Sequence, residues 1–96
     1  MYLSEDAKKL LVAANGASGW IKVTKASGTH GLWFYVRIKS ETEPPFAEGL
    51  DHEQGGHWNS VIHELYETGL IHPRHTKPGI TTYKLTELGS HTAREN

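Results

Sequence analysis

Residues 57–71 read HWNSVIHELYETGLI, and apolar side chains recur in this stretch at intervals of three and four residues. This spacing predicts an amphipathic helix packed on a core. Gly69 follows at the point where helices commonly end on a residue with left-handed backbone. The recurring apolar residues are Trp58, Val61, Ile62, Leu65 and Tyr66. The stretch therefore predicts a helix over residues 57–68 with an abrupt exit.

Two short apolar runs follow, at residues 70–72 and 80–85. They flank the segment PRHTKPG at 73–79, whose prolines and glycine are typical of a turn. The pattern predicts a β-hairpin with a basic tip. Thr86 can then cap a final helix that carries Leu88, although Gly89 weakens that helix.

The first half of the chain predicts a helix and then a hairpin. Ser4 or Asp6 can cap a helix that runs to about residue 14. Residues 19–24 and 32–39 are typical of strands joined by a turn over 26–31, although 32–39 is also compatible with a helix. Residues 41–56 hold Pro44, Pro45 and three glycines. They predict a loop, or a short helix after the prolines.

Side chains alternate across a strand, so the predicted hairpin has two different faces. One face is apolar and holds Ile21, Val23, Leu32, Phe34, Val36 and Ile38. The other interleaves aromatic rings with cations: Trp20, Lys22, Trp33, Tyr35, Arg37 and Lys39. Such a stripe suits a surface that stacks unpaired bases, but aromatic residues of this kind more often lie in a dimer interface or under a neighbouring helix.

The composition is that of an ordinary globular domain. The 96 residues are 36% hydrophobic and 22% charged, which predicts a single domain over residues 1–96. The absence of cysteine excludes disulfides, thiolate metal sites and cysteine nucleophiles, and favours a cytoplasmic location. The start of the chain lacks the features of a signal peptide, and no apolar run reaches the length of a membrane span, so we expect no membrane partner.

The net charge of −1 conceals three segments of different sign. Residues 1–40 carry six Lys/Arg and two Asp/Glu, a net of +4. Residues 41–69 carry seven acidic residues and no Lys/Arg, a net of −7, and residues 70–96 carry four basic and two acidic residues, a net of +2. Any contacts with phosphate must therefore come from the two ends of the chain.

Two motifs resemble the winged helix-turn-helix domain of MarR- and PadR-like regulators. Residues 65–71, LYETGLI, look like that family's exit from the recognition helix into the first wing strand. Residues 83–89, YKLTELG, look like the end of the second wing strand and the start of the last helix. The resemblance implies an α+β fold, a winged helix-turn-helix with an additional N-terminal β-hairpin. Residues 46–54 would then supply the second helix.

The resemblance also implies a function: a small bacterial or phage transcriptional regulator that binds double-stranded DNA as a homodimer, without a cofactor. The recognition helix would be 57–68, with His57, Glu64 and Glu67 as further contacts, and the wing 72–79. The DNA-binding residues would be Asn59, Ser60, His63, Arg74, His75 and Lys77.

The alternative is a protein–protein interaction module that presents the acidic segment 41–67 and the aromatic hairpin 20–39 to a partner. Seven histidines suggest metal binding, but the chain has no HExxH pattern, and we expect no metal site. Ser60 and His63 are better interpreted as a polar helix face than as a catalytic pair. We expect no enzyme activity.

Overall fold

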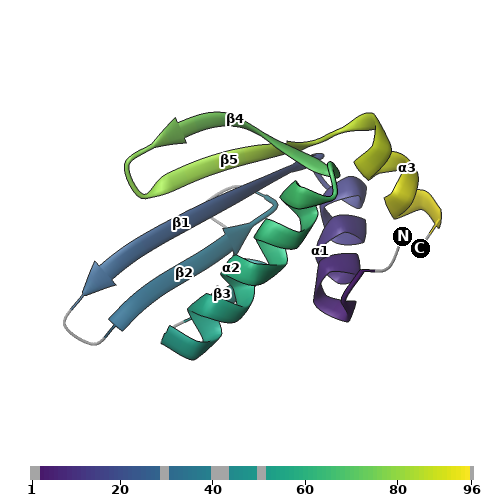
Figure 1. The fold of residues 1–96 in the computed structure, drawn as a ribbon. Coiled ribbons are helices and arrows are strands. Elements are labelled where there is room, and N and C mark those ends of the chain that lie inside the picture. Colours follow the sequence, from purple (N-terminus) through teal and green to yellow (C-terminus); the bar gives the residue numbers. More distant parts are fainter. Residues whose placement is uncertain (1–2, 29–30, 40–43, 50–51, 96) are drawn as a thin grey trace.

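The computed structural model describes residues 3–28, 31–39, 44–49 and 52–95 (Figure 1). Within these ranges the chain forms three helices and one antiparallel sheet of five strands in the order β3-β2-β1-β5-β4. In chain order the elements are α1 (Glu5–Gly16), β1 (Trp20–Gly28), β2 (Gly31–Arg37), β3 (Ala47–Gly49), α2 (His52–Glu67), β4 (Ile71–Lys77), β5 (Ile80–Leu85) and α3 (Glu87–Glu95). The α+β class is as expected.

The winged helix-turn-helix prediction is wrong. Between α1 and α2 the described residues form three strands of the sheet, and none of them forms a helix that could pair with α2 as a helix-turn-helix. The predicted second helix over 46–54 is also wrong, because its first part contributes β3 and its last part belongs to α2. Moreover, β5 pairs with β1, so the predicted wing contributes two of the five strands of the sheet.

Of the two predicted caps, Ser4 and Asp6, it is Ser4 that caps α1: its hydroxyl accepts a hydrogen bond from the Ala7 N–H at 3.4 Å. The helix runs to Gly16, slightly beyond the predicted end. The buried residues recur at spacings of three and four and so form one stripe along the helix: Ala7, Leu10, Leu11 and Ala14.

The β1–β2 hairpin confirms the strand prediction for residues 32–37 and shows that the helix alternative was wrong. Val23 lies opposite Val36 and Lys22 opposite Arg37, so the apolar and the aromatic-cationic sets occupy opposite faces. On the apolar face Ile21, Val23, Phe34 and Val36 are buried. The side chains of Leu32 and Trp33 lie outside the described part of the structure.

Helix α2 begins at His52, one turn and more before the predicted start. Its end is as predicted: Gly69 has a φ of 75°. The Leu70 N–H donates to the Leu65 carbonyl and the Gly69 N–H to the Tyr66 carbonyl, both at 3.0 Å. These two bonds form a Schellman motif, which turns the chain back into the sheet.

The second hairpin is longer than predicted. Strand β4 includes Pro73 and continues to Lys77, so only Pro78 and Gly79 form the turn, with Gly79 at a φ of 76°. The register shifts between Pro73 and His75, which marks a β-bulge at Arg74. Proline is tolerated because β4 is an edge strand, where one side of the backbone needs no partner.

One core lies between the apolar face of the sheet and the helices, which all contribute to it. Helix α2 lies across β2 and β3, while α1 and α3 pack together at one end of the sheet (Figure 1). Of the stripe predicted in α2, Val61, Ile62 and Leu65 are buried and Trp58 is partly buried, but Tyr66 is 47% exposed. The opposite face of the sheet receives no helix from the described part of the chain.

Thr86 ends β5 and caps α3, as expected. Its hydroxyl accepts from the Gly89 N–H at 3.0 Å and donates to the Gly69 carbonyl at 2.7 Å. Its own N–H donates to the Leu70 carbonyl at 3.1 Å. One residue thus connects the exit of α2, the end of β5 and the start of α3.

Candidate nucleic-acid interface

The helix-free side of the sheet brings together two sets of residues that lie far apart in the sequence. Because β1 pairs with both β2 and β5, Lys22 lies opposite Arg37 on one side and opposite Thr82 on the other. Trp20 lies opposite Lys84. Residues paired directly across antiparallel strands share a face, so the stripe of the first hairpin continues onto the second.

The wing residues lie on the same face. His72 pairs with Lys84, His75 with Thr82, and Lys77 with Ile80, which places all three on the helix-free side. Arg74, the extra residue of the bulge, lines a hollow on this side together with Trp20 and Lys84. We call this surface the basic face and define it by Trp20, Lys22, Tyr35, Arg37, His72, Arg74, His75, Lys77, Thr82 and Lys84.

The charge on the basic face is strongly positive. Its cations are Lys22, Arg37, Arg74, Lys77 and Lys84, and the one carboxylate placed on it by the described registers is that of Glu48, opposite Tyr35. The Arg37 guanidinium lies 5.9 Å from the centroid of the Tyr35 ring, a cation–π contact. In the described ranges neither Arg74 nor Lys84 forms an ion pair.

A hollow of about 360 Å³ lies in the basic face between β1, β5 and β4. It is lined by Trp20, Lys22, Arg74, Thr82, Tyr83 and Lys84. Its volume is at the lower end of the range typical of small-molecule sites. Two aromatic residues, Trp20 and Tyr83, and three cationic residues therefore line one shallow depression.

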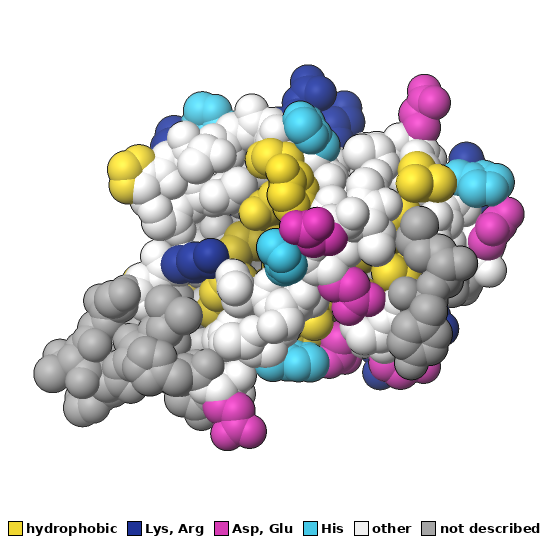
Figure 2. Space-filling model, in the orientation of Figure 1, with side chains coloured by type: hydrophobic (Ala, Val, Ile, Leu, Met, Phe, Trp, Pro, Cys, Tyr) yellow, Lys and Arg dark blue, Asp and Glu magenta, His cyan; other side chains and the backbone are white. Residues whose placement is uncertain are grey.

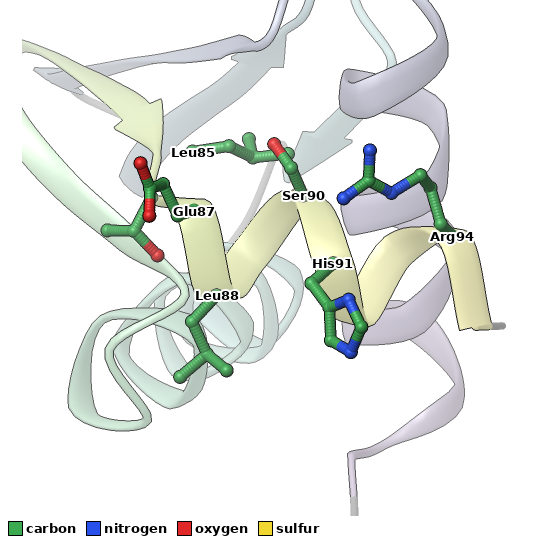
Figure 3. A pocket seen from close by; sticks show the side chains of 7 residues that line it. Leu85, Glu87, Leu88, Ser90, His91 and Arg94 are labelled. Carbon is green, nitrogen blue, oxygen red and sulfur yellow. The ribbon is translucent and has the colours of Figure 1, made fainter.

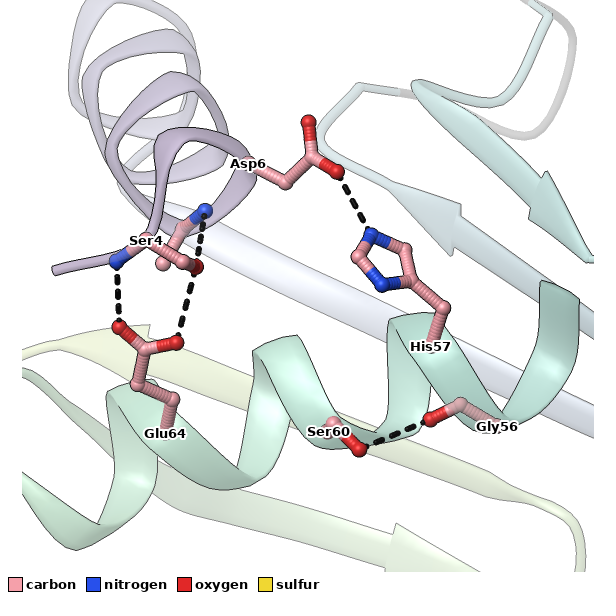
Figure 4. Close-up of polar contacts among 7 residues, drawn as sticks. Ser4, Asp6, Gly56, His57, Ser60 and Glu64 are labelled. Carbon is pink, nitrogen blue, oxygen red and sulfur yellow. Dashed lines mark hydrogen bonds and ion pairs between the residues drawn. The ribbon is translucent and has the colours of Figure 1, made fainter. Parts of the chain in front are cut away.

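Helix α2 does not present the surface expected of a recognition helix (Figure 4). Two of its polar residues, His57 and Glu64, bind α1 instead. The Glu64 carboxylate accepts from the Ser4 N–H at 2.8 Å and from the Ser4 hydroxyl at 2.9 Å, and His57 Nε2 lies 2.6 Å from Asp6 Oδ2. Both contacts fasten the N-terminal turn of α1 to α2.

The three residues predicted to contact bases from α2 remain exposed: Asn59, Ser60 and His63. They share a shallow surface with Glu64, Glu67 and Thr68, and His63 Nε2 lies 3.2 Å from Glu67 Oε1. Figure 2 shows carboxylates beside α2, while Lys and Arg side chains gather along the upper rim, above β4 and β5. Carboxylates at this position repel phosphate, so the electrostatics favour the basic face over α2.

Replacing Glu64 by alanine is expected to lower the free energy of unfolding by about 1 to 2 kcal/mol, because two charge-assisted hydrogen bonds to the cap of α1 are lost at a half-buried position. Urea denaturation measures the change. Glu67→Ala is the matched control: in the described part of the chain the Glu67 carboxylate pairs with exposed His63, and its loss should cost about 0.5 kcal/mol or less. If both substitutions lowered the free energy of unfolding equally, the hydrogen bonds between Glu64 of α2 and Ser4 at the start of α1 would not contribute to stability.

A larger hollow of about 620 Å³ lies beside α3, but it lacks the cluster of cationic and aromatic residues that lines the hollow in the basic face (Figure 3). Its lining mixes Glu87, His91 and Arg94 with exposed Leu88. In the close-up, Leu88 and His91 point to one side of α3 and Arg94 to another, so these side chains diverge. His91 pairs with Glu95 one turn on, at 3.0 Å. The lining has neither a dominant charge nor converging polar groups.

Tyr83 provides a pH-dependent contribution to stability. Burial raises the pKa of its phenol above the usual 10.0, and the nearby Tyr66 adds a smaller increase. A group whose pKa is higher in the folded state contributes its full stabilisation when the pH is below its unfolded-state pKa. This contribution is lost as the pH rises through its folded-state pKa. We therefore expect stability to fall above pH 10 less steeply in Tyr83→Phe than in the natural chain, measured by urea denaturation at pH 9 to 11. Parallel curves would contradict this expectation.

Across the described ranges, no group of three or more His, Asp or Glu residues is placed to hold a metal ion. None of the helices within residues 3–28 and 52–95 has the length and apolar content that a membrane crossing requires. No family model matches the chain, and neither a curated protein nor a solved structure is significantly similar to it.

Sequence reasoning found both parts of the basic face but placed them in separate sites. It missed Lys84 and Thr82, although strand alternation puts both on the face opposite Leu85. That signal was available locally. The pairing of β1 with β5, which joins the two parts, had no local signal.

Proposed function

We propose that this protein binds nucleic acid on the basic face, with its strands rather than with α2. The observation that carries the proposal is the pairing of β1 with β5, which joins the aromatic-cationic stripe and the wing cations in one surface. Phosphate is recognised by arginine and lysine side chains held along a surface, and aromatic rings between them contact bases.

The charge distribution supports one orientation of the ligand. Glu64 and Glu67 flank the outer side of α2, whereas the basic face has Glu48 as its described carboxylate. A polyanion is therefore attracted to the sheet and repelled by α2. Lys22 and Arg37 make further interactions of their own, so Arg74, Lys77 and Lys84 are the main cations that attract a phosphate to this face.

The test is a fluorescence anisotropy titration at low salt with a labelled oligonucleotide of about 12 nucleotides. Neutralising between three and five phosphates on a single strand would give a log–log salt slope between about −2 and −3.5. The double variant Arg74→Ala/Lys84→Ala should weaken binding and make the slope less negative by about 1.4. The matched control is Lys8→Ala/Lys9→Ala on α1, away from the basic face, and should leave the slope unchanged.

The proposal fails if neither single-stranded nor duplex oligonucleotide binds at about 10 to 100 µM protein, the range of non-specific affinities. It also fails if the α1 control weakens binding as much as the basic-face variant, because the attraction would then come from overall charge. Variants of Asn59 and His63 test α2 directly. If Asn59→Ala/His63→Ala lost more affinity for the oligonucleotide than Arg74→Ala/Lys84→Ala, the nucleic-acid interface would lie on α2 and not on the basic face.

A second candidate function is a protein interaction through α2, favoured by Tyr66. This side chain is 47% exposed and neighbours exposed Glu67 and His63. Exposed tyrosine beside polar groups is typical of interface hot spots. Part of the acidic segment 41–67, namely residues 41–43 and 50–51, lies outside the described residues. Cross-linking in cells that captured a protein through position 66, with no oligonucleotide binding in vitro, would favour this function.

A further inference from the structure

The 360 Å³ hollow in the basic face has the composition of a subsite for one unpaired nucleotide. We infer that it stacks a single base on Trp20 and holds the adjoining phosphates on Lys22, Arg74 and Lys84, so that the protein prefers single strands to duplexes. The inference rests on the proposed function and adds to it the class of nucleic acid.

The spacing of the strands suits this assignment. Lys84 lies directly across from Trp20, where Cβ atoms of a pair are about 5 Å apart. Lys22 lies two residues further along β1 on the same face, about 7 Å away. The two cations therefore flank the ring on different sides, as the phosphates flank a base along a strand. Arg74 reaches the same hollow from the bulge in β4.

The ring of Trp20 is suited to stacking. The side chain is half-buried, which holds the ring in place while part of it remains accessible. Within the described residues its indole N–H forms no hydrogen bond. A neighbouring base stacks on such a ring with little regard to sequence, because every base has a π-face.

A duplex cannot use this subsite without opening. In a duplex each base is covered on both faces by its neighbours, and extracting one costs a few kcal/mol. The phosphate contacts alone remain for a duplex. The preference for single strands should therefore depend on Trp20, whereas the shared part of the affinity should depend on Arg74 and Lys84.

The experiment compares three ligands: a labelled oligothymidylate of about 12 nucleotides, a duplex of equal length, and a base-free phosphodiester strand of equal length. The variants are Trp20→Leu, which keeps apolar bulk but removes the ring, and Trp20→Phe, which keeps a ring. Circular dichroism and thermal unfolding check that each variant is folded. Arg74→Ala/Lys84→Ala serves as the charge variant.

We expect Trp20→Leu to weaken oligothymidylate binding by about 5-fold to 150-fold, the range of one lost base–aromatic stack. Trp20→Phe should lose less, and the affinity for duplex and for the base-free strand should not change. The charge variant should weaken all three ligands. If Trp20→Leu is unfolded, the inference is still tested by comparing two ligands, oligothymidylate and the base-free strand, on the natural chain and on Trp20→Phe. A stacked base should make oligothymidylate the tighter of the two ligands.

The outcomes separate the two proposals. Equal binding of oligothymidylate, duplex and base-free strand, with no effect of Trp20→Leu, overturns the nucleotide subsite and leaves the basic face as a phosphate surface. Absence of binding to every ligand overturns the proposed function itself. If folded Trp20→Leu loses binding to all three ligands, the subsite is also overturned. The ring would then serve to position the cationic side chains and would not stack on a base.

Discussion

Replacing Gly89 by alanine is expected to lower the free energy of unfolding by about 2 to 3 kcal/mol. A Cβ atom at this position would lie 2.0 Å from the Leu70 carbonyl oxygen and 3.0 Å from its carbon. The contact is with backbone, and the same carbonyl accepts the Thr86 N–H, so neither partner can move aside without loss of that bond. Helix α3 would have to shift away from the exit of α2 and from α1. The penalty exceeds the advantage of about 1 kcal/mol that alanine has over glycine in a helix.

Gly56→Ala is the matched control for this prediction. Gly56 lies inside α2, and a Cβ atom there would have no neighbour within 4 Å. Alanine should therefore stabilise the protein by about 0.5 to 1 kcal/mol through its lower backbone entropy. Urea denaturation measures the change in the free energy of unfolding for both variants, analysed with the same dependence of that free energy on urea concentration. A Gly89→Ala protein as stable as Gly56→Ala would show that α3 does not approach Leu70 so closely.

Phe34→Ala is expected to cost about 3 to 5 kcal/mol, a large fraction of the 5 to 15 kcal/mol typical of a domain. Phe34 is completely buried and is the largest of the fully buried side chains. It lies at the centre of β2, beneath α2, and the Lys25 ammonium lies 5.6 Å from its ring centroid. Truncation leaves a cavity between sheet and helix and removes this cation–π contact. Thermal unfolding followed by circular dichroism measures the loss.

The same substitution at Phe46 is the control, because its side chain is 37% exposed. Phe46 makes an edge contact with Trp58, with 6.2 Å between ring centroids, and a pair of this kind contributes about 0.5 to 1.5 kcal/mol. Phe46→Ala should therefore cost less than half as much as Phe34→Ala. A larger loss at Phe46 would contradict the described core.

Several elements were predictable because their signals are local. The apolar spacing and Gly69 predicted the body and the end of α2, and alternation predicted the two faces of the first hairpin. The cap at Ser4 and the double role of Thr86 also follow from nearby residues. The motifs of the second half were real structural features, but they describe a helix exit and a hairpin end, which folds other than the winged helix also contain.

The segment between the hairpin and α2 was not predictable in the same way. A Cβ atom on Gly49 would lie 2.6 Å from the Gly55 backbone nitrogen, so β3 and α2 approach closely because glycines lie at the contact. In the sequence these glycines indicate a loop. Gly89 is a similar case. The low helix propensity of glycine disfavours α3 at this position, whereas the close approach to the Leu70 backbone leaves no room for a larger residue.

The candidate site divides along the same line. The sequence by itself determined the residue types and the alternation of the stripe at Trp20, Lys22, Tyr35 and Arg37, and the presence of the cations Arg74 and Lys77, because these are local properties. Only the tertiary structure decided that these sets share a face and that His57 and Glu64 bind α1. Both facts depend on pairings between residues about 50 to 65 positions apart, such as Trp20 with Lys84 and Ser4 with Glu64. Such pairings are set by the burial of a common core, which no single segment can specify.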